Sequence, residues 1–328
     1  MLSIKNYRYT AAALGIVLMM TACAPGTQQG SQQATTSAPA ALQTRGASEG
    51  LQGSGQGLAE SGLPTDSSTE DPAVVKAYTD YANYIGQNLI DTWNSWFQQR
   101  GIPQQDVAFI IVPKGAQGTT TCTDAGGGTH KPVTDEGSAF FCATDKMADG
   151  RTGVIWLPLT SMIGIVNGDV YGNGQSQWPG DFAFAETIAH EFGHHVESSL
   201  EDWYTKNQPS AGVKPPRGAW NELLADCFAG NWTEAAYTQG ALQNGDYDEA
   251  IAKIGLTGDS YSFGPDGSII FDPSSDPHGA PNHRVGAYKV GVEGVPAGNY
   301  QPGDPQTCIS YYWQADKDYT YDMVLPAG

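Results

Sequence analysis

The sequence feature that most constrains this chain is the stretch 190–195, with the sequence His-Glu-Phe-Gly-His-His. If the stretch is helical, His190 and His194 lie one turn apart on the same face, because side chains at positions i and i+4 stack. Two imidazoles placed in this way can bind one zinc ion, and Glu191 can then reach a water on that ion. The pattern therefore predicts a half-buried helix that carries a metal-dependent hydrolytic centre, with Glu191 as general base.

Catalytic zinc needs a third protein ligand, and a second predicted helix offers one. Residues 218–238 have the apolar spacing of a helix, and Glu222 and Asp226 lie on one face of it. We expect Glu222 to be the third ligand, and Asp226 to accept a hydrogen bond from the free ring nitrogen of a ligating histidine. The alternative is a solvated acidic pair at a helix start. His195 is expected to be structural or to face solvent, and not to be a ligand, because it lies about 100° round the helix from His194.

A second histidine-containing stretch contributes His278, His283 and Arg284. Each of these side chains could stabilise the oxyanion of a tetrahedral intermediate if the fold brings it to the metal. A histidine in a turn rich in Gly and Pro is more often exposed and without a role, so that alternative stays open.

The charge of the chain limits its partners. The 328 residues include 35 Asp and Glu against 16 Lys and Arg, a formal net charge of −19. Such an excess of negative charge argues against nucleic acid or an anionic membrane surface as the main partner. We expect a peptide or protein substrate and Zn²⁺ as the cofactor, and the sequence does not predict an oligomeric state.

The N-terminus predicts export. Lys5 and Arg8 precede an apolar run over 11–20, which is too short to span a bilayer and is typical of a signal peptide. The sequence Met-Thr-Ala-Cys that ends at Cys23 resembles a bacterial lipobox. We therefore expect removal of a signal peptide over 1–22, lipidation of Cys23, and a place in the cell envelope with this lipid as the only membrane contact. Ordinary cleavage nearby would instead leave a secreted protein with a spare thiol.

The remaining four of the five cysteines indicate two disulfides in an oxidising compartment. Four cysteines allow three connectivities. We favour Cys122–Cys142, which closes a loop between neighbouring segments, with Cys227–Cys308 as the remainder. The chain has no Cys-x-x-Cys pair, so a cysteine-rich zinc site is not expected.

The distribution of polar and apolar residues predicts the domain organisation. Residues 23–70 lack apolar periodicity and are expected to form a lipidated cysteine followed by a disordered tether. One zinc-binding domain is expected over 71–328. Its predicted helices lie at 72–100, from a cap at Asp181 to about 200, at 218–238, at 247–254 and at 282–290, and its strands at 107–112, 139–143, 154–157 and 269–271. This order predicts an α+β domain, mainly helical, with a small sheet packed on the active-site helix.

Two motifs together resemble one bacterial family. Residues 190–196 are His-Glu-Phe-Gly-His-His-Val, and residues 222–230 are Glu-Leu-Leu-Ala-Asp-Cys-Phe-Ala-Gly. The putative neutral zinc metallopeptidase family is similar, with a His-Glu-x-Gly-His-His-Val helix followed by a Glu-Leu-x-Ala-Asp-Cys-x-Ala-Gly helix. Further similar segments are Phe141-Cys142 and His278-Gly279 with Arg284, and the resemblance covers roughly 72–310. One departure is His283, where the family often has Gln.

The resemblance implies a gluzincin-like metallopeptidase fold, with His190, His194 and Glu222 on zinc and Glu191 as the base. It does not indicate what is cut, because many members are assigned by motif and not by substrate. The expected function is hydrolysis of peptide bonds by a zinc metallopeptidase. Two alternatives are a zinc amidase acting on cell-wall peptides and a non-catalytic zinc-binding surface lipoprotein. The intact Glu191 favours a catalytic site, because zinc binding alone does not need this carboxylate.

Overall fold

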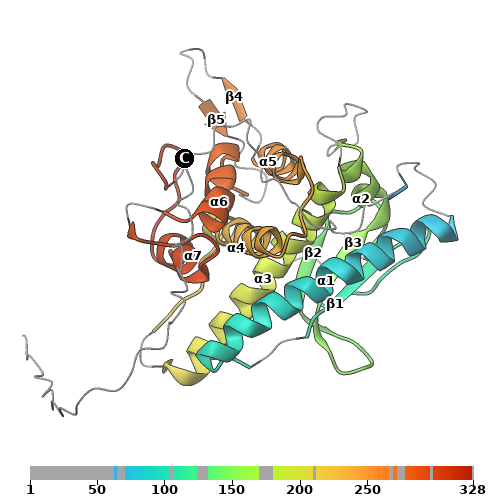
Figure 1. The fold of residues 1–328 in the computed structure, drawn as a ribbon, viewed down its shortest axis with the longest axis horizontal. Helices are drawn as coiled ribbons and strands as arrows, with labels where there is room; N and C mark the ends of the chain where they lie inside the picture. Colours follow the sequence, from blue (N-terminus) through green and yellow to red (C-terminus); the bar gives the residue numbers. More distant parts are fainter. Residues whose placement is uncertain are drawn as a thin grey trace, which may run out of the picture. The chain divides into compact units, whose positions relative to one another are not determined.

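A computed structural model describes residues 63–64, 71–103, 106–123, 132–169, 180–209, 212–259, 261–263, 265, 269–271, 278–295 and 298–326. All of these residues belong to one unit that spans 42–328, and Figure 1 shows how its helices and strands are arranged. The predicted signal peptide over 1–22, the lipidation of Cys23 and most of the predicted tether lie outside the described residues. None of the described helices is long and apolar enough to cross a membrane.

Helix α1 (Pro72–Arg100) begins and ends as the sequence predicts. The side chain of Asp71 caps its first turn, and Gly101, in the left-handed conformation, ends it. Aromatic and aliphatic side chains recur along α1 at helical spacing and form a stripe, most of which is buried. Pro64 falls inside the predicted tether, yet its carbonyl accepts a hydrogen bond from the Tyr78 hydroxyl at 3.2 Å. Part of the segment before α1 is therefore in contact with the folded part of the chain.

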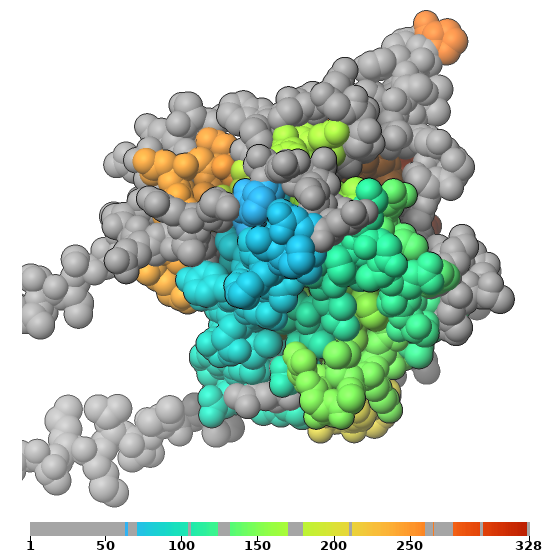
Figure 2. Space-filling model, turned by 90° about the vertical axis from the view of Figure 1, so that its right-hand side faces the viewer, coloured from blue at the N-terminus to red at the C-terminus, as the bar shows by residue number. Residues whose placement is uncertain are grey.

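Three strands form a small mixed sheet in the order β1-β3-β2. Strand β1 (Ala108–Val112) runs parallel to β3 (Thr152–Pro158), and β2 (Phe140–Lys146) runs antiparallel to β3 on its other side. A small cluster of apolar side chains covers one face of the sheet, while α1 and α3 contact the sheet as part of the main core. Figure 2 shows α1, in blue to cyan, and the green region around 132–169 on one face of the molecule.

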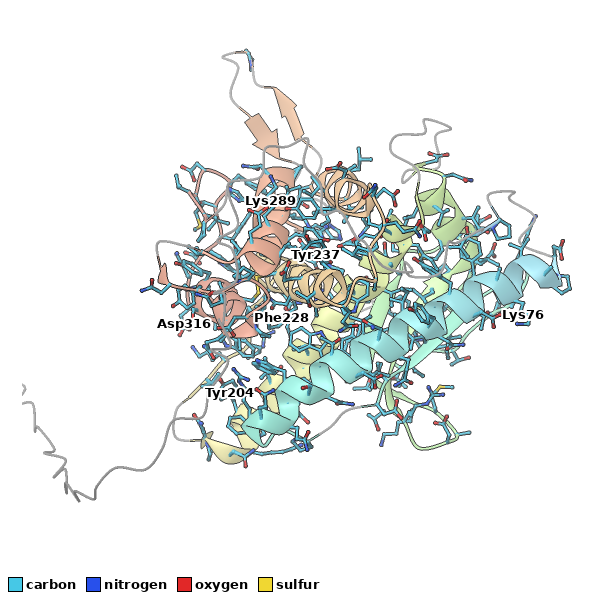
Figure 3. All side chains as sticks on the ribbon, viewed as in Figure 1. Lys76, Tyr204, Phe228, Tyr237, Lys289 and Asp316 are labelled. Carbon is cyan, nitrogen blue, oxygen red and sulfur yellow. A yellow bond between two sulfur atoms is a disulfide. The ribbon has the colours of Figure 1, made fainter. Side chains whose placement is uncertain are left out.

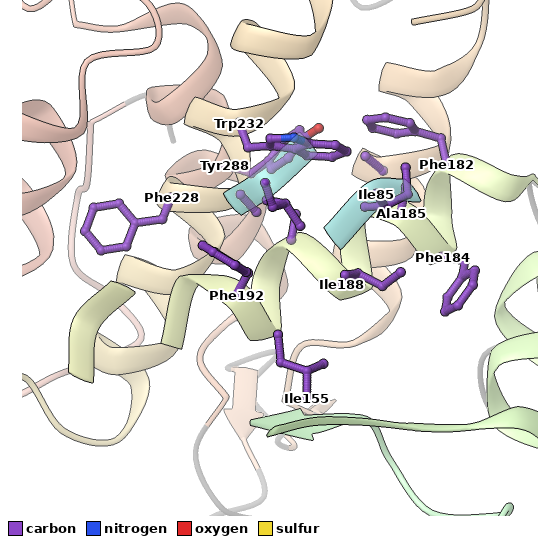
Figure 4. Packing of buried hydrophobic residues seen from close by; sticks show 14 of the residues in the cluster. Ile85, Ile155, Phe182, Phe184, Ala185, Ile188, Phe192, Phe228, Trp232 and Tyr288 are labelled. Atoms are coloured by element: carbon purple, nitrogen blue, oxygen red, sulfur yellow. The ribbon is translucent and has the colours of Figure 1, made fainter. Parts of the chain in front are cut away.

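Helix α3 (Asp181–Asn207) lies at the centre of the fold, between the sheet and the C-terminal helices (Figures 1 and 4). In Figure 4, Ile155 of β3 lies on one side of α3, while Trp232 and Tyr288 lie on the other, with Ile188 and Phe192 of α3 between them. All five of these side chains are nearly or fully buried. The apolar side chains of α3 therefore pack in two directions, against the sheet and against the neighbouring helices.

The start of α3 differs from the prediction. The helix begins at Asp181, which does not cap it, and the preceding Gly180 has no side chain to do so. The carboxylate of Glu249 accepts a hydrogen bond from the backbone N–H of Phe182 at 3.1 Å in its place, and a Cβ atom at Gly180 would overlap that carboxylate. The predicted Asp181 cap is wrong because the capping group comes from a residue distant in sequence. The helix also continues to Asn207, beyond the predicted end at about 200.

The C-terminal half is helical. It contains α4 (Ala219–Thr238), α5 (Asp246–Leu256), α6 (Pro281–Glu293) and α7 (Pro305–Tyr312), with a short hairpin of β4 (Tyr261–Phe263) and β5 (Ile269–Phe271) between α5 and α6. Helices α4 and α6 touch backbone to backbone, since a Cβ atom at Gly291 would overlap the carbonyl oxygen of Cys227. Helix α2 (Leu159–Val166), α7 and β4 were not predicted. In Figure 3, Phe228 of α4 lies in the interior and Lys76 lies at the outer end of α1.

Both favoured disulfides are present. Cys122 is bonded to Cys142, which ties the segment after β1 to β2. Cys227 is bonded to Cys308, which ties α4 to α7. Together, the helices, the small sheet and its contact with α3 confirm the predicted mainly helical α+β fold.

Candidate metal centre

Two neighbouring helices bring together the three side chains predicted to bind zinc. His190 and His194 lie on one face of α3, with ring centroids 4.8 Å apart. Glu222, from the first turn of α4, points between them. Its Oε2 lies 3.3 Å from His190 Nε2, and its Oε1 lies 3.6 Å from His194 Nε2. Each of the three residues therefore offers a ligand atom to the same small volume.

The close approach of α3 and α4 depends on Gly193. A Cβ atom at this position would lie 2.8 Å from both the Cα and the carbonyl oxygen of Ala225, on the facing helix. A side chain at residue 193 would therefore push the helices apart. Gly193 in the middle of the predicted helix costs about 1 kcal/mol relative to Ala, and the contact with α4 is the structural reason for it.

The ligand separations fit a zinc ion. Ligand atoms at about 2.0–2.2 Å from a tetrahedral metal lie about 3.4 Å from each other, close to the 3.3 and 3.6 Å between Glu222 and the two imidazoles. Within the described ranges, the group contains three ligands and no fourth His, Cys, Asp or Glu. A metal held by His190, His194 and Glu222 would thus keep a position open, as catalytic zinc requires.

The outer nitrogen of His190 is held by a buried charge pair. Its Nδ1 lies 2.8 Å from Asp226 Oδ1, and Asp226 is fully buried. The Arg284 guanidinium donates to both Asp226 oxygens, at 2.7 and 2.8 Å, and to the Thr257 carbonyl at 2.9 Å. Asp226 thus lies where the sequence predicts it, beside a histidine predicted to bind zinc. Most donors of Arg284 are engaged behind His190, which favours a positioning role for this residue over transition-state stabilisation.

The outer nitrogen of His194 has two neighbours that sequence reasoning missed. Its Nδ1 lies 3.1 Å from Glu197 Oε2, one turn further along α3, and 2.8 Å from the side-chain amide of Asn221. Both signals were present in the sequence: Glu197 stands at i+3 from His194, and Asn221 directly precedes Glu222. Such groups fix the ring orientation of a metal ligand.

The charges around the site shift its pKa values strongly. Burial lowers the pKa of His190, but Asp226 and Glu222 outweigh burial and raise it to about 10. Burial raises the pKa of Asp226, but Arg284 and His190 more than offset this and lower it to about 2. The pKa of Glu222 is likewise lowered by both imidazoles, against the effect of burial. The site therefore favours positive charge between its carboxylates, supplied by protons or by a metal ion.

Glu191 and His195 differ in their surroundings although both belong to the motif. Glu191 lines the cavity beside the predicted metal ligands, where its carboxylate can meet a water or a substrate. His195 packs edge-on against the rings of Phe141 and Phe192. Burial lowers the pKa of His195 to about 4, so this imidazole is neutral at physiological pH. Its surroundings agree with the structural role expected for it.

A cavity of about 1140 Å³ opens over the three predicted metal ligands. The lining residues from α3 lie on one stripe of the helix, between Thr187 and Glu201. On other sides the cavity is lined by the segment 136–141 at the start of edge strand β2, by α2, and by residues from α4 and α5. The site is thus a cleft large enough for several residues of a peptide.

The two histidines of the second stretch lie in different places. His278 lines the cavity, and its side chain is 49% exposed. The buried carboxylate of Asp259 accepts hydrogen bonds from the backbone N–H groups of His278 and Gly279, at 2.8 and 2.9 Å. His283 is buried and bonds through Nδ1 to the Tyr319 hydroxyl at 2.8 Å. His283 is not among the residues that line the cavity, so its position suits a structural contact.

A second group of possible ligands overlaps the first. Glu186, His190 and Asp226 also place ligand atoms within 4.8 Å of one another. Two cations already neutralise these carboxylates, since Lys253 pairs with Glu186 and Arg284 pairs with Asp226. A second metal ion here would be repelled by both cations.

Comparison with known proteins agrees with this geometry. The sequence model of the family described as "Putative neutral zinc metallopeptidase" matches residues 48–310. The uncharacterized protein YpfJ of Escherichia coli (strain K12) is 28% identical over 228 residues, which is 67% of each chain. The uncharacterized protein Rv2575 of Mycobacterium tuberculosis (strain ATCC 25618 / H37Rv) is 28% identical over 190 residues, 55% of this chain and 57% of its own. No solved structure is significantly similar to this chain.

Proposed function

The chain belongs to the putative neutral zinc metallopeptidase family, and we propose that it is a zinc-dependent peptidase that hydrolyses peptide bonds. One observation carries the proposal: His190, His194 and Glu222 place their ligand atoms within 4.8 Å of one another, beside a cleft that Glu191 also lines. A structural zinc site would close its fourth position with a protein ligand, and the described residues supply none at this point.

The chain's own residues divide the chemistry. When bound, a zinc ion lowers the pKa of a coordinated water and polarises the substrate carbonyl. Glu191 acts as general base, accepts the proton of the attacking water and passes it to the leaving amine. His190 and His194 are held in register by Asp226 and Glu197 behind them.

Two further features support a peptide as the substrate. The segment around Phe140 lines the cavity and belongs to a strand at the edge of the described sheet, where backbone groups can pair with an extended peptide. His278 reaches the same cavity, and Asp259 fixes its backbone. His278 is therefore the better placed of the two histidines in its stretch to stabilise a developing oxyanion.

We also propose that the protein acts outside the cytoplasm. The signal-like N-terminus and Cys23 support an exported protein that is lipid-anchored in the cell envelope, and the two disulfides fit an oxidising compartment. The partner in this proposal is a peptide or protein substrate, with no nucleic acid.

The test is cleavage of a peptide library by the wild type and by Glu191→Gln, with the zinc content of each protein measured. We expect Glu191→Gln to hydrolyse peptides about 10²–10⁴-fold more slowly than the wild type, which is the size of a general-base contribution. The variant should keep its zinc. Glu201→Gln is the matched control, because Glu201 lines the same cleft and is exposed; it should cleave like the wild type.

Three results would contradict the proposal. Full activity in Glu191→Gln would exclude the proposed base. Stoichiometric zinc without any cleavage of peptides would favour the non-catalytic alternative. Hydrolysis confined to cell-wall peptides would favour the amidase.

A further inference from the structure

A buried ion pair beside the metal ligands has no part in the chemistry proposed above. Glu186 lies one turn before His190 on α3. Lys253 comes from α5, and its Nζ lies 2.7 Å from Glu186 Oε2. The side chains of Lys253 and Glu186 are 7% and 0% exposed. The fold thus places a lysine ammonium next to a candidate metal centre and almost out of contact with water.

This pair is poorly satisfied. A buried ion pair offsets its desolvation only if its geometry is good and the remaining donors and acceptors find partners. Apart from the contact between Lys253 and Glu186 Oε2, the oxygens of Glu186 have no hydrogen-bond partner among the described residues. A lysine ammonium has three donors, and within the part of the chain that the structure describes its one charged partner is Glu186. Stability alone therefore does not explain why these charges are buried.

Lys253 also belongs to the wall of the cavity. Lys253 lines it together with Thr257, one turn further along the chain, and with Thr187, which directly follows Glu186. Met162 and Ile163 of α2 add apolar surface to the same cavity. An ammonium in the wall of a cavity that hydroxyl and apolar side chains also line suits a carboxylate joined to a side chain, as at the C-terminus of a peptide.

We propose that Lys253 binds the C-terminal carboxylate of the substrate, so that the protein cuts peptides near their C-terminus. The proposal rests on the proposed function, because it takes the metal centre as the place of cleavage. Glu186 and His190 are one turn apart, about 6 Å along the helix axis, and an extended peptide advances about 3.3 Å per residue. One or two residues fit between the carboxylate and the cleaved bond. Water adds across that bond, and the products are a shortened peptide and either one amino acid or a dipeptide.

The first experiment measures binding without turnover. Peptides of one sequence, with a free C-terminal acid or a C-terminal amide, are titrated into zinc-loaded Glu191→Gln protein. The free acid should bind at least tenfold more tightly than the amide. When Lys253→Met is added to this protein, the free acid should bind only as tightly as the amide, and binding of the amide should not change. Lys253→Arg should keep the preference for the free acid. The control is Lys206→Met, which removes an exposed lysine that pairs with Asp202 on α3 and should change neither Kd.

Glu186→Gln separates substrate binding from a structural role. Removing the carboxylate leaves the charge of Lys253 without its neutralising partner, so the free acid should bind as tightly as before or more tightly. Equal losses in Glu186→Gln and Lys253→Met, or equal weakening of both peptides in Lys253→Met, would overturn the proposal. Zinc content measured on each variant identifies any protein that has lost its fold.

Product analysis with wild-type enzyme completes the test. Mass spectrometry should show release of single amino acids or dipeptides from the free acid, and slower cleavage of the amide. Cleavage only at internal bonds, independent of the C-terminal group, would contradict the role of Lys253. If no peptide is cleaved but binding of the free-acid peptide still depends on Lys253, the proposed peptidase function is wrong. The assignment of Lys253 as a carboxylate-binding residue is then still supported.

Discussion

The protonation of His190 is set by the charged side chains that surround its two ring nitrogens. Asp226 contacts Nδ1 of His190 and is itself fixed by Arg284, while Glu222 lies near Nε2. These carboxylates outweigh the effect of burial and raise the pKa of His190 to about 10. A metal that binds Nε2 must displace the proton this pKa retains at neutral pH, so zinc affinity and proton release are linked.

Zinc binding at pH 7.5 should therefore release at least one proton, and the apparent affinity should fall as the pH is lowered. Asp226→Asn removes a charge that raises the pKa of His190, so this pKa moves back toward its ordinary value and proton release decreases. We also expect zinc affinity to fall by about 10–100-fold, the usual effect of losing such a partner. Calorimetric titration in two buffers of different ionisation enthalpy measures both quantities. Asp202→Asn removes an exposed carboxylate from the same helix and should change neither; unchanged proton release in Asp226→Asn would contradict the linkage.

The spacing between α3 and α4 connects the fold to the metal centre. Gly193 and Ala225 meet backbone to backbone, and this contact brings the first turn of α4 to the histidines of α3. Glu222 would move away from His190 and His194 if the two helices separated. Zinc affinity should therefore respond to the packing of these helices as well as to the ligands themselves.

Gly193→Ala tests that dependence. Its Cβ atom would lie 2.8 Å from the Ala225 backbone, and such overpacking costs about 1–3 kcal/mol, against the gain of about 1 kcal/mol that Ala brings to a helix. We expect lower stability in urea unfolding of the metal-free protein and weaker zinc binding. Gly255→Ala is the matched control in α5, because its Cβ would lie 3.8 Å from Val285 Cγ2, an ordinary contact; it should be neutral or stabilising. Equal behaviour of the two variants would exclude a special role for the α3–α4 contact.

Elements with strong local patterns could be predicted, whereas those defined by distant contacts could not. The stripe of α1, its Asp71 cap and its Gly101 stop are local signals, and the helix begins and ends where they indicate. The start of α3 is capped by Glu249, which is distant in sequence, so local rules pointed to Asp181 instead. Helix α7 begins with the same local signal as α1, an Asp cap followed by Pro, but it is too short for an apolar stripe to mark it.

The residues of the candidate site also fall into two groups, those that local spacing predicts and those that are placed by distant contacts. Spacing within each helix placed His190, His194, Glu222 and Asp226, because residues four apart share a face. The contact of Asn221 with His194 depends on how α3 and α4 pack. Asp259 holds the backbone of His278 across a separation of 19 residues. Periodicity carries no information on such pairs, since they arise only when whole elements are in place.

At the scale of the whole molecule, the last described segment holds part of the cleft in place. The family match ends at residue 310, and the chain beyond it packs against α4 and the start of α6. The Trp220 indole donates to the Lys317 carbonyl at 2.8 Å. The Tyr319 hydroxyl accepts a hydrogen bond from the Ala280 N–H at 2.7 Å, and the Tyr321 hydroxyl donates to Asp259 at 3.1 Å. This tail therefore supports the segment that carries His278 to the cavity.

Tyr319→Phe tests whether the tail stabilises the segment that carries His278. The change removes the acceptor of the buried Ala280 N–H, and leaving such a donor unpaired costs about 1–3 kcal/mol. We expect a loss of stability of that size in urea unfolding and faster hydrogen exchange at Ala280, with unchanged zinc content because the three ligands lie on α3 and α4. Peptide cleavage should weaken if His278 takes part in it. Tyr84→Phe is the control, since Tyr84 is 47% exposed on α1; if both variants exchange and unfold alike, the tail does not hold this segment.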